Sequence, residues 1–144
     1  MIKEAYVSFE IAKLLKEKGF NEYCWKLYEL VDLNKPILLN GFELDSDSKF
    51  WDNKYLELYK KEHSYINDIC SAPTHQMVMQ WLREIHNLHI VPKKDFYGGF
   101  YTGRIYDDRR EIITDKDDYI ACSGYDKYED ATEAAIKYCL ENMI

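Results

Sequence analysis

The sequence predicts an α+β protein with a mainly antiparallel sheet and about three helices packed on one face. Apolar residues recur at helical spacing in three segments, at about 9–18, 75–86 and 127–142. Short segments of alternating polarity lie between these helices without regular βαβ alternation, which favours antiparallel strands over a parallel sheet. The length of 144 residues fits a single α+β domain, residues 1–144.

The central helix has the clearest pattern in the chain. Thr74 follows Pro73 and can cap the helix, because its hydroxyl can accept a hydrogen bond from an amide of the first turn. Asn87 can end the helix. The apolar stripe expected in the core consists of Met77, Val78, Trp81, Leu82 and Ile85.

The first and last helices are predicted from their ends as well as from their apolar spacing. Ser8 can cap the first helix, and Gly19 followed by Phe20 is typical of a left-handed terminator with its hydrophobic contact. Asp126 and Glu129 stand in the relation of a capping box at the start of the last helix. Its expected buried stripe is Ala131, Ala135, Ile136, Cys139, Leu140 and Met143.

The strands are predicted from alternation and from turn residues. Asn40-Gly41, within the apolar segment Ile37 to Leu44, predicts a hairpin turn. Residues 45–54 have the composition of a loop, and residues 55–70 are compatible with both a helix and an extended segment. The other expected strands are Tyr23 to Leu30, Leu88 to Val91, Phe96 to Tyr106, Glu111 to Thr114 and Tyr119 to Cys122.

The charge distribution argues against nucleic acid as a partner. The formal net charge is −7, and residues 107–144 carry 11 acidic against 5 basic side chains. Tight nonspecific binding to phosphates needs lysine and arginine in excess. The 13 tyrosines instead offer amphipathic contact area of the kind found at protein interfaces, although many can be ordinary strand residues.

Cysteine usage and hydropathy indicate a cytoplasmic protein. The four cysteines, Cys24, Cys70, Cys122 and Cys139, are widely spaced and contain no C-x-x-C pair. The start of the chain is too polar for a secretory signal, and no apolar segment approaches the length of a transmembrane helix. We therefore expect a reducing compartment and no membrane contact.

Cys70 is the sharpest candidate for enzymatic chemistry. It precedes the central helix, whose N-terminal amides could lower the pKa of the thiol, and His75 or His89 could act as the base. Cys70 stands four residues before Thr74, however, so a buried structural thiol is the competing interpretation. No metal-ligand spacing and no cofactor motif accompany these residues, so the sequence predicts neither a metal nor a cofactor.

The segment Phe96 to Tyr106 is the best candidate for a binding surface. Tyr97 and Tyr101 offer flat contact area, and Arg104 offers a planar set of donors. Alternation places the two tyrosines on one face, which we expect to be exposed, and Phe96 and Phe100 on the other. The competing interpretation is an edge strand with ordinary cross-strand aromatics.

Several short motifs together resemble those of a known group of proteins. These are A-P-T at 72–74, W-L-R-E at 81–84 with His86, and Y-E-D-A-x-E-A at 128–134. As a set they resemble short uncharacterised proteins of Bacteroides-type gut bacteria and their prophages or mobile elements. The resemblance implies a bacterial, phage-related accessory protein and transfers no catalytic residue.

The sequence thus favours a non-enzymatic module that binds a protein partner, because no nucleophile, base and orienting group converge in it. The alternative is a cysteine-dependent hydrolase or transferase that uses Cys70 with His75 or His89.

Overall fold

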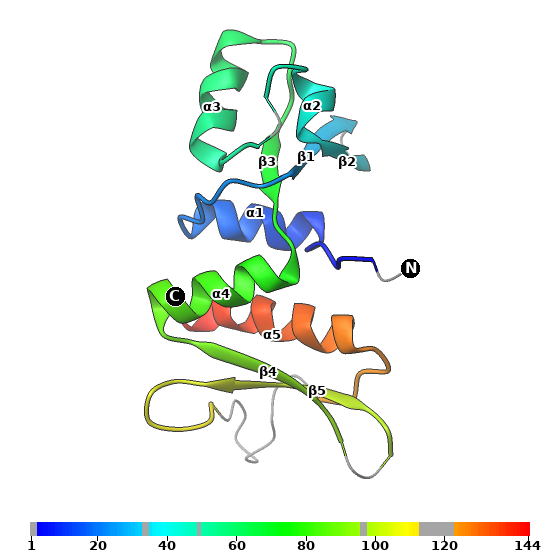
Figure 1. Cartoon of the computed structure of the whole chain (residues 1–144), viewed down its shortest axis with the longest axis vertical. Helices are drawn as coiled ribbons and strands as arrows, with labels where there is room; N and C mark the ends of the chain where they lie inside the picture. The colour runs from blue at the N-terminus through cyan, green and yellow to red at the C-terminus, as the bar shows by residue number, and fades with distance from the viewer. Residues whose placement is uncertain (1–2, 33–34, 49, 96–97, 113–122) are drawn as a thin grey trace. The chain divides into compact units, whose positions relative to one another are not determined.

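The structure is a computed structural model that describes residues 3–32, 35–48, 50–95, 98–112 and 123–144. It confirms the α+β class, with antiparallel strands in two sheets rather than one. The elements in chain order (Figure 1) are α1 (Phe9–Glu17), β1 (Lys26–Asp32), β2 (Lys35–Asn40), α2 (Gly41–Leu44), α3 (Asn53–Glu62), β3 (Ile69–Ala72), α4 (His75–His86), β4 (His89–Lys94), β5 (Tyr101–Tyr106) and α5 (Tyr128–Asn142).

Contacts divide the chain into two compact units. The N-terminal unit comprises residues 6–74, and the C-terminal unit comprises residues 1–5 with residues 75–144. Each unit holds one of the sheets, and the expectation of a single domain over 1–144 stays a prediction. Among the residues that the structure describes, none of the helices combines the length and the apolar character needed to cross a bilayer.

The sheet of the N-terminal unit has the strand order β2-β1-β3. Leu27 of β1 faces a buried apolar cluster, whereas Tyr28 faces the other side, where its hydroxyl donates to the Val7 carbonyl at 2.7 Å. This alternation is the one expected of a strand covered on both faces. The cluster around Leu27 consists of Trp51, Leu56, Ile66 and Ile69.

The ends of α1 follow the sequence prediction. The Ser8 hydroxyl accepts from the Ile11 amide at 3.3 Å, and Gly19 has a φ of 89°. The Phe20 amide donates to the Leu15 carbonyl at 2.9 Å, and the Phe20 side chain is buried. A positive φ at this position is the terminator geometry that glycine adopts without strain.

The hairpin predicted at Asn40-Gly41 is wrong. β1 pairs with β2 in a register that joins Asp32 to Lys35 at one end and Lys26 to Asn40 at the other, so Asn40 is a paired strand residue and not part of a turn. Gly41 instead begins α2 and is buried, where its amide donates to Trp25 and its carbonyl accepts from the Trp51 indole. Gly41 therefore contributes backbone hydrogen bonds to Trp25 and Trp51 rather than a turn between two strands.

Helix α3 covers the first part of residues 55–70, the segment that the sequence leaves open between a helix and an extended structure. It starts at Asn53, inside the expected loop, because the Asp52 carboxylate accepts from the Tyr55 amide at 2.7 Å and caps it. The helix ends at Glu62, and residues 69–72 then form β3.

In the C-terminal unit, α4 has the bounds that the sequence predicts, and Asn87 follows it with a φ of 54°. Val78, Trp81 and Leu82 are buried as expected, but Ile85 is 63% exposed and Met77 is only partly buried. At the end of the helix, Leu88 is buried in place of Ile85. The Leu88 amide donates to the Leu82 carbonyl at 3.0 Å, which folds the chain back over the helix end. Met79 is the buried residue that the predicted stripe omitted.

The C-terminal sheet pairs β4 with β5, and α5 packs against both strands. Gly103 permits this packing, since a Cβ atom there would lie 2.5 Å from the Ala131 carbonyl oxygen and 2.7 Å from the Ala135 Cβ. The stripe predicted on α5 is buried except for Met143.

Four predictions about the strands and caps of this unit need correction or lie wholly or partly outside the described residues. β5 starts at Tyr101 rather than Phe96, because Gly98 and Gly99, both at positive φ, form the turn before it. The capping box of α5 is wrong, because Lys127 is its N-cap residue and makes no side-chain cap bond. Of the expected strand at 111–114, the structure describes residues 111 and 112. Glu111 forms an isolated bridge with Tyr106, and the Ile112 amide donates to the Ile105 carbonyl at 2.7 Å. The expected strand at 119–122 lies outside the described residues.

Candidate functional site

The candidate nucleophile Cys70 lies within β3, opposite Tyr28 of β1, and is 2% exposed. Burial raises the pKa of its thiol to about 12, and the charges of Lys16 and Lys13 offset this rise only in part. The thiolate is the nucleophilic form of cysteine, so this environment disfavours the activity. Cys24 is in the same state, with its pKa raised to about 12 by burial.

The two candidate bases belong to the other unit. His75 is the first residue of α4 and is buried, with its Nε2 atom 2.5 Å from a carboxylate oxygen of Glu133. His89 begins β4, opposite Tyr106. Within either unit, the structure therefore brings no histidine proposed as a base together with Cys70. No group of three or more metal-ligating side chains occurs among the described residues.

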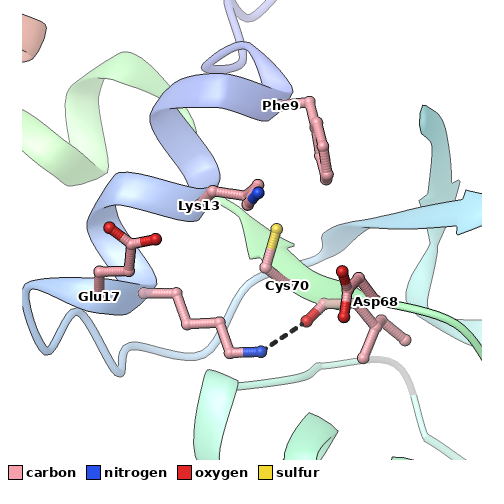
Figure 2. Close-up of a pocket in the computed structure, with 7 residues that line it drawn as sticks. Phe9, Lys13, Glu17, Asp68 and Cys70 are labelled. Carbon is pink, nitrogen blue, oxygen red and sulfur yellow. Dashed lines mark hydrogen bonds between the residues drawn. The ribbon is translucent and has the colours of Figure 1, made fainter. Parts of the chain in front are cut away.

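A pocket of about 310 Å³ opens between α1 and the start of β3, and Cys70 lies in its wall. Figure 2 shows the Cys70 thiol between the Lys13 side chain and Asp68. The seven lining residues are Phe9, Lys13, Lys16, Glu17, Asp68, Ile69 and Cys70.

Two charged side chains of this pocket are already held by protein groups. Lys16 forms an ion pair with Glu57 and donates to the Ile69 carbonyl at 3.0 Å. Asp68 pairs with Lys60 at 3.0 Å, and the bond from Lys60 lowers the pKa of its carboxyl. Lys13 differs, because it makes no ion pair with any residue that the structure describes and instead lies 5.8 Å from the centre of the Phe9 ring.

The residues that the sequence singled out for binding are placed as follows. Tyr97 lies outside the described residues. Tyr101 is partly buried, with its ring edge-on to Tyr128 at 6.1 Å. Arg104, on the opposite face of β5, donates to both carboxylate oxygens of Glu111 at 2.9 and 3.2 Å. Phe100, expected in the core, is 45% exposed, because it belongs to the turn before β5. A binding role for the first three stays a prediction.

The structure shows an exposed aromatic surface that sequence reasoning missed. We define the aromatic patch as Tyr23, Trp25, Phe42 and Phe50, whose side chains are between 42% and 64% exposed. Trp25 and Phe50 contact each other edge to face, with ring centres 5.1 Å apart.

Backbone pairing produces this patch. Cys24 and Trp51 exchange both backbone hydrogen bonds, at 3.0 and 2.9 Å, and both side chains are buried. Because side chains alternate along paired extended segments, the neighbours Tyr23, Trp25 and Phe50 point outward. In the sequence, the pattern is visible as aromatic residues next to Cys24 and Trp51: Tyr23 and Trp25 flank the cysteine, and Phe50 precedes the tryptophan.

Carboxylates surround the aromatic patch along the chain. Two lysines, Lys26 and Lys49, lie within three residues of a patch aromatic. Lys26 extends over the Tyr6 ring at 4.7 Å, and Lys49 lies outside the described residues. The acidic residues within the same span are Glu22, Glu43, Asp45, Asp47 and Asp52.

Comparisons with protein-family models, with curated proteins and with solved structures find no match to this chain.

Proposed function

We propose that this chain is a non-enzymatic protein-binding module and that its aromatic patch contacts a basic segment of a partner protein. The contact between the rings of Trp25 and Phe50, both of them exposed, is the observation that supports the proposal most directly. Tryptophan and phenylalanine are enriched in protein interfaces, and apolar side chains gathered on a surface mark interaction sites.

The charge around the patch favours a basic partner. Five carboxylates stand against two lysines near its aromatics in the sequence. Lysine and arginine side chains bind over aromatic faces and pair with carboxylates, so a segment rich in arginine satisfies both kinds of group. Acidic and purely apolar partners would leave the carboxylates without counter-charge.

The properties of Cys70 weigh against the alternative of a cysteine-dependent hydrolase or transferase. Such an enzyme needs an accessible thiolate beside a base, whereas burial raises the pKa of this thiol to about 12. The further proposals, a bacterial accessory protein of phage or mobile-element type that acts in the cytoplasm, rest on the sequence motifs and on the thiols. No disulfide joins Cys24, Cys70 or Cys139, the cysteines that the structure describes.

The proposal is tested with defined peptides rather than with a lysate. A fluorescein-labelled peptide of alternating arginine and glycine is titrated with the full chain, and the binding is followed by fluorescence anisotropy. The Trp25→Ser, Phe50→Ser double variant should weaken binding at least tenfold, because exposed cation–π contacts and interface aromatics contribute on the order of 1 to 2 kcal/mol each.

The control is the Leu58→Ser, Tyr65→Ser double variant, which removes two exposed apolar side chains of the same unit outside the patch. It should bind as the unchanged chain does, and thermal melting should show both variants folded. Equal binding by both double variants, or equal binding of a glutamate–glycine peptide, would contradict the proposal.

A further inference from the structure

We propose that the pocket between α1 and β3 binds a small monocarboxylate with a flat apolar body, and that Lys13 supplies the counter-charge. This site is distinct from the aromatic patch, and it does not depend on the protein-binding function proposed above. Its volume of about 310 Å³ lies at the lower end of the range for small-molecule sites.

The apolar part of the ligand would contact one wall of the pocket. Phe9 offers a ring that is partly buried and held edge-on to Tyr28 at 5.7 Å. Cys70 adds a thiol that burial keeps protonated. Ile69 meets the pocket through its backbone carbonyl, because its side chain lies in the cluster on the other face of β3. A neutral thiol packs well against a flat apolar group and offers little to a polar one.

The charged part of the ligand would be held by the one lysine of the pocket that has no carboxylate partner among the described residues. Lys16 is occupied by Glu57 and by the Ile69 carbonyl, and Asp68 is occupied by Lys60. Lys13 extends from the exposed side of α1 over Phe9. Its positive charge is felt at the pocket wall, where it acts to lower the pKa of both the Cys70 thiol and the Asp68 carboxyl.

The remaining carboxylates limit how much negative charge the pocket accepts. Asp68 and Glu17 both line it, so a phosphate with two negative charges would be repelled more strongly than a carboxylate with one. Glu17 could instead attract an amine. Figure 2 shows the Glu17 carboxylate to one side, away from the Cys70 thiol, whereas Lys13 lies above that thiol. This arrangement favours an anion beside the apolar wall.

The test is a titration of the isotope-labelled full chain with phenylacetate, followed by amide chemical shifts. We expect shifts to gather at residues 9–17 and 68–70. The Lys13→Gln variant should bind phenylacetate about fivefold more weakly, because it loses the positive charge that pairs with the carboxylate at an exposed position. Lys61→Gln removes the same charge from an exposed position of α3 outside the pocket and should change the affinity less than twofold.

Two further ligands test whether the pocket recognises the negative charge of phenylacetate, its ring, or both. 2-Phenylethylamine carries the same ring with a positive charge, and inorganic phosphate carries the charge without the ring. Tighter binding of either one than of phenylacetate would overturn the proposal. So would equal loss of affinity in the two lysine variants, or the absence of shifts at residues 9–17 and 68–70 with phenylacetate at tens of millimolar.

Discussion

Burial keeps two thiols of the N-terminal unit in the protonated form. Cys24 and Cys70 are almost fully buried, and burial raises the pKa of each to about 12. A cysteine in this state is a small apolar residue rather than a reactive one. The position of Cys70 before the central helix in the sequence does not indicate that its side chain is buried within β3.

These thiols should make the protein sensitive to alkali. In the unfolded chain they ionise near pH 9.0, the ordinary value, but in the folded chain only near 12. Above pH 9 the unfolded state therefore holds fewer protons. The free energy of unfolding should then fall by roughly 1.4 kcal/mol per thiol for each pH unit.

Urea denaturation at pH 8 and at pH 10 measures this effect. The Cys24→Ala, Cys70→Ala double variant starts from a lower stability but should lose about 2 to 3 kcal/mol less between the two pH values. If the variant and the unchanged chain lose the same amount, other groups cause the alkaline sensitivity.

Trp81 and Ile85 provide a matched pair on α4, because the first is 6% exposed and the second 63% exposed. Trp81→Ala should lower the free energy of unfolding by about 3 to 5 kcal/mol, the usual cost of removing a buried large aromatic. Ile85→Ala should change it by less than about 1 kcal/mol. Chemical denaturation of both variants checks the assignment of the buried face, and equal losses would contradict it.

At the scale of elements, the packing of β5 on α5 depends on a single missing side chain. Gly103→Ala would place a methyl group 2.5 Å from the Ala131 carbonyl oxygen, which is backbone and cannot rotate away. We expect a loss of about 1 to 3 kcal/mol, as in other overpacked sites, seen as a lower melting temperature. Val91→Ala, at an exposed position of β4, is the control. An unchanged melting temperature of the glycine variant would show that the strand can move away from the helix.

Local sequence rules predicted the elements whose causes are local. The Ser8 cap, the terminator at Gly19 and the stripe on α5 each depend on neighbours within a few positions, and the structure shows all three. Asn40-Gly41 failed because a turn signal competes with tertiary packing, and here the buried Gly41 serves the Trp51 indole. The capping box of α5 failed because the same residue types can also be simply exposed polar residues.

The candidate site was harder to predict than the fold. The aromatic patch depends on the pairing of Cys24 with Trp51, which are far apart in the sequence and belong to no regular strand pair. The pocket depends on how α1 packs against β3, which no spacing within either element specifies. The most conspicuous aromatic run in the sequence lies around Tyr101 and therefore predicts the site, whereas the aromatics of the patch lie apart along the chain and give no such signal.

At the scale of the whole molecule, the net charge of −7 should act on association with a basic partner. Raising the salt concentration from 50 to 500 mM shortens the screening length by about threefold. The affinity for the arginine–glycine peptide should fall by about tenfold but not vanish, because the contacts with Trp25 and Phe50 are screened less than the exposed carboxylates. Anisotropy titrations at the two salt concentrations measure this, and complete loss of binding would indicate a purely Coulombic association.

The unequal exposure of the three tryptophans also gives the protein an internal optical reporter. Trp51 and Trp81 lie in the interiors of the two units, one in each, whereas Trp25 is 42% exposed. Emission from Trp25 should therefore lie at longer wavelength and be open to quenching by iodide, while the other two emit at shorter wavelength and are shielded. Occupation of the aromatic patch can be read as protection of one emitter, and unfolding of either unit as exposure of another, without attaching a dye.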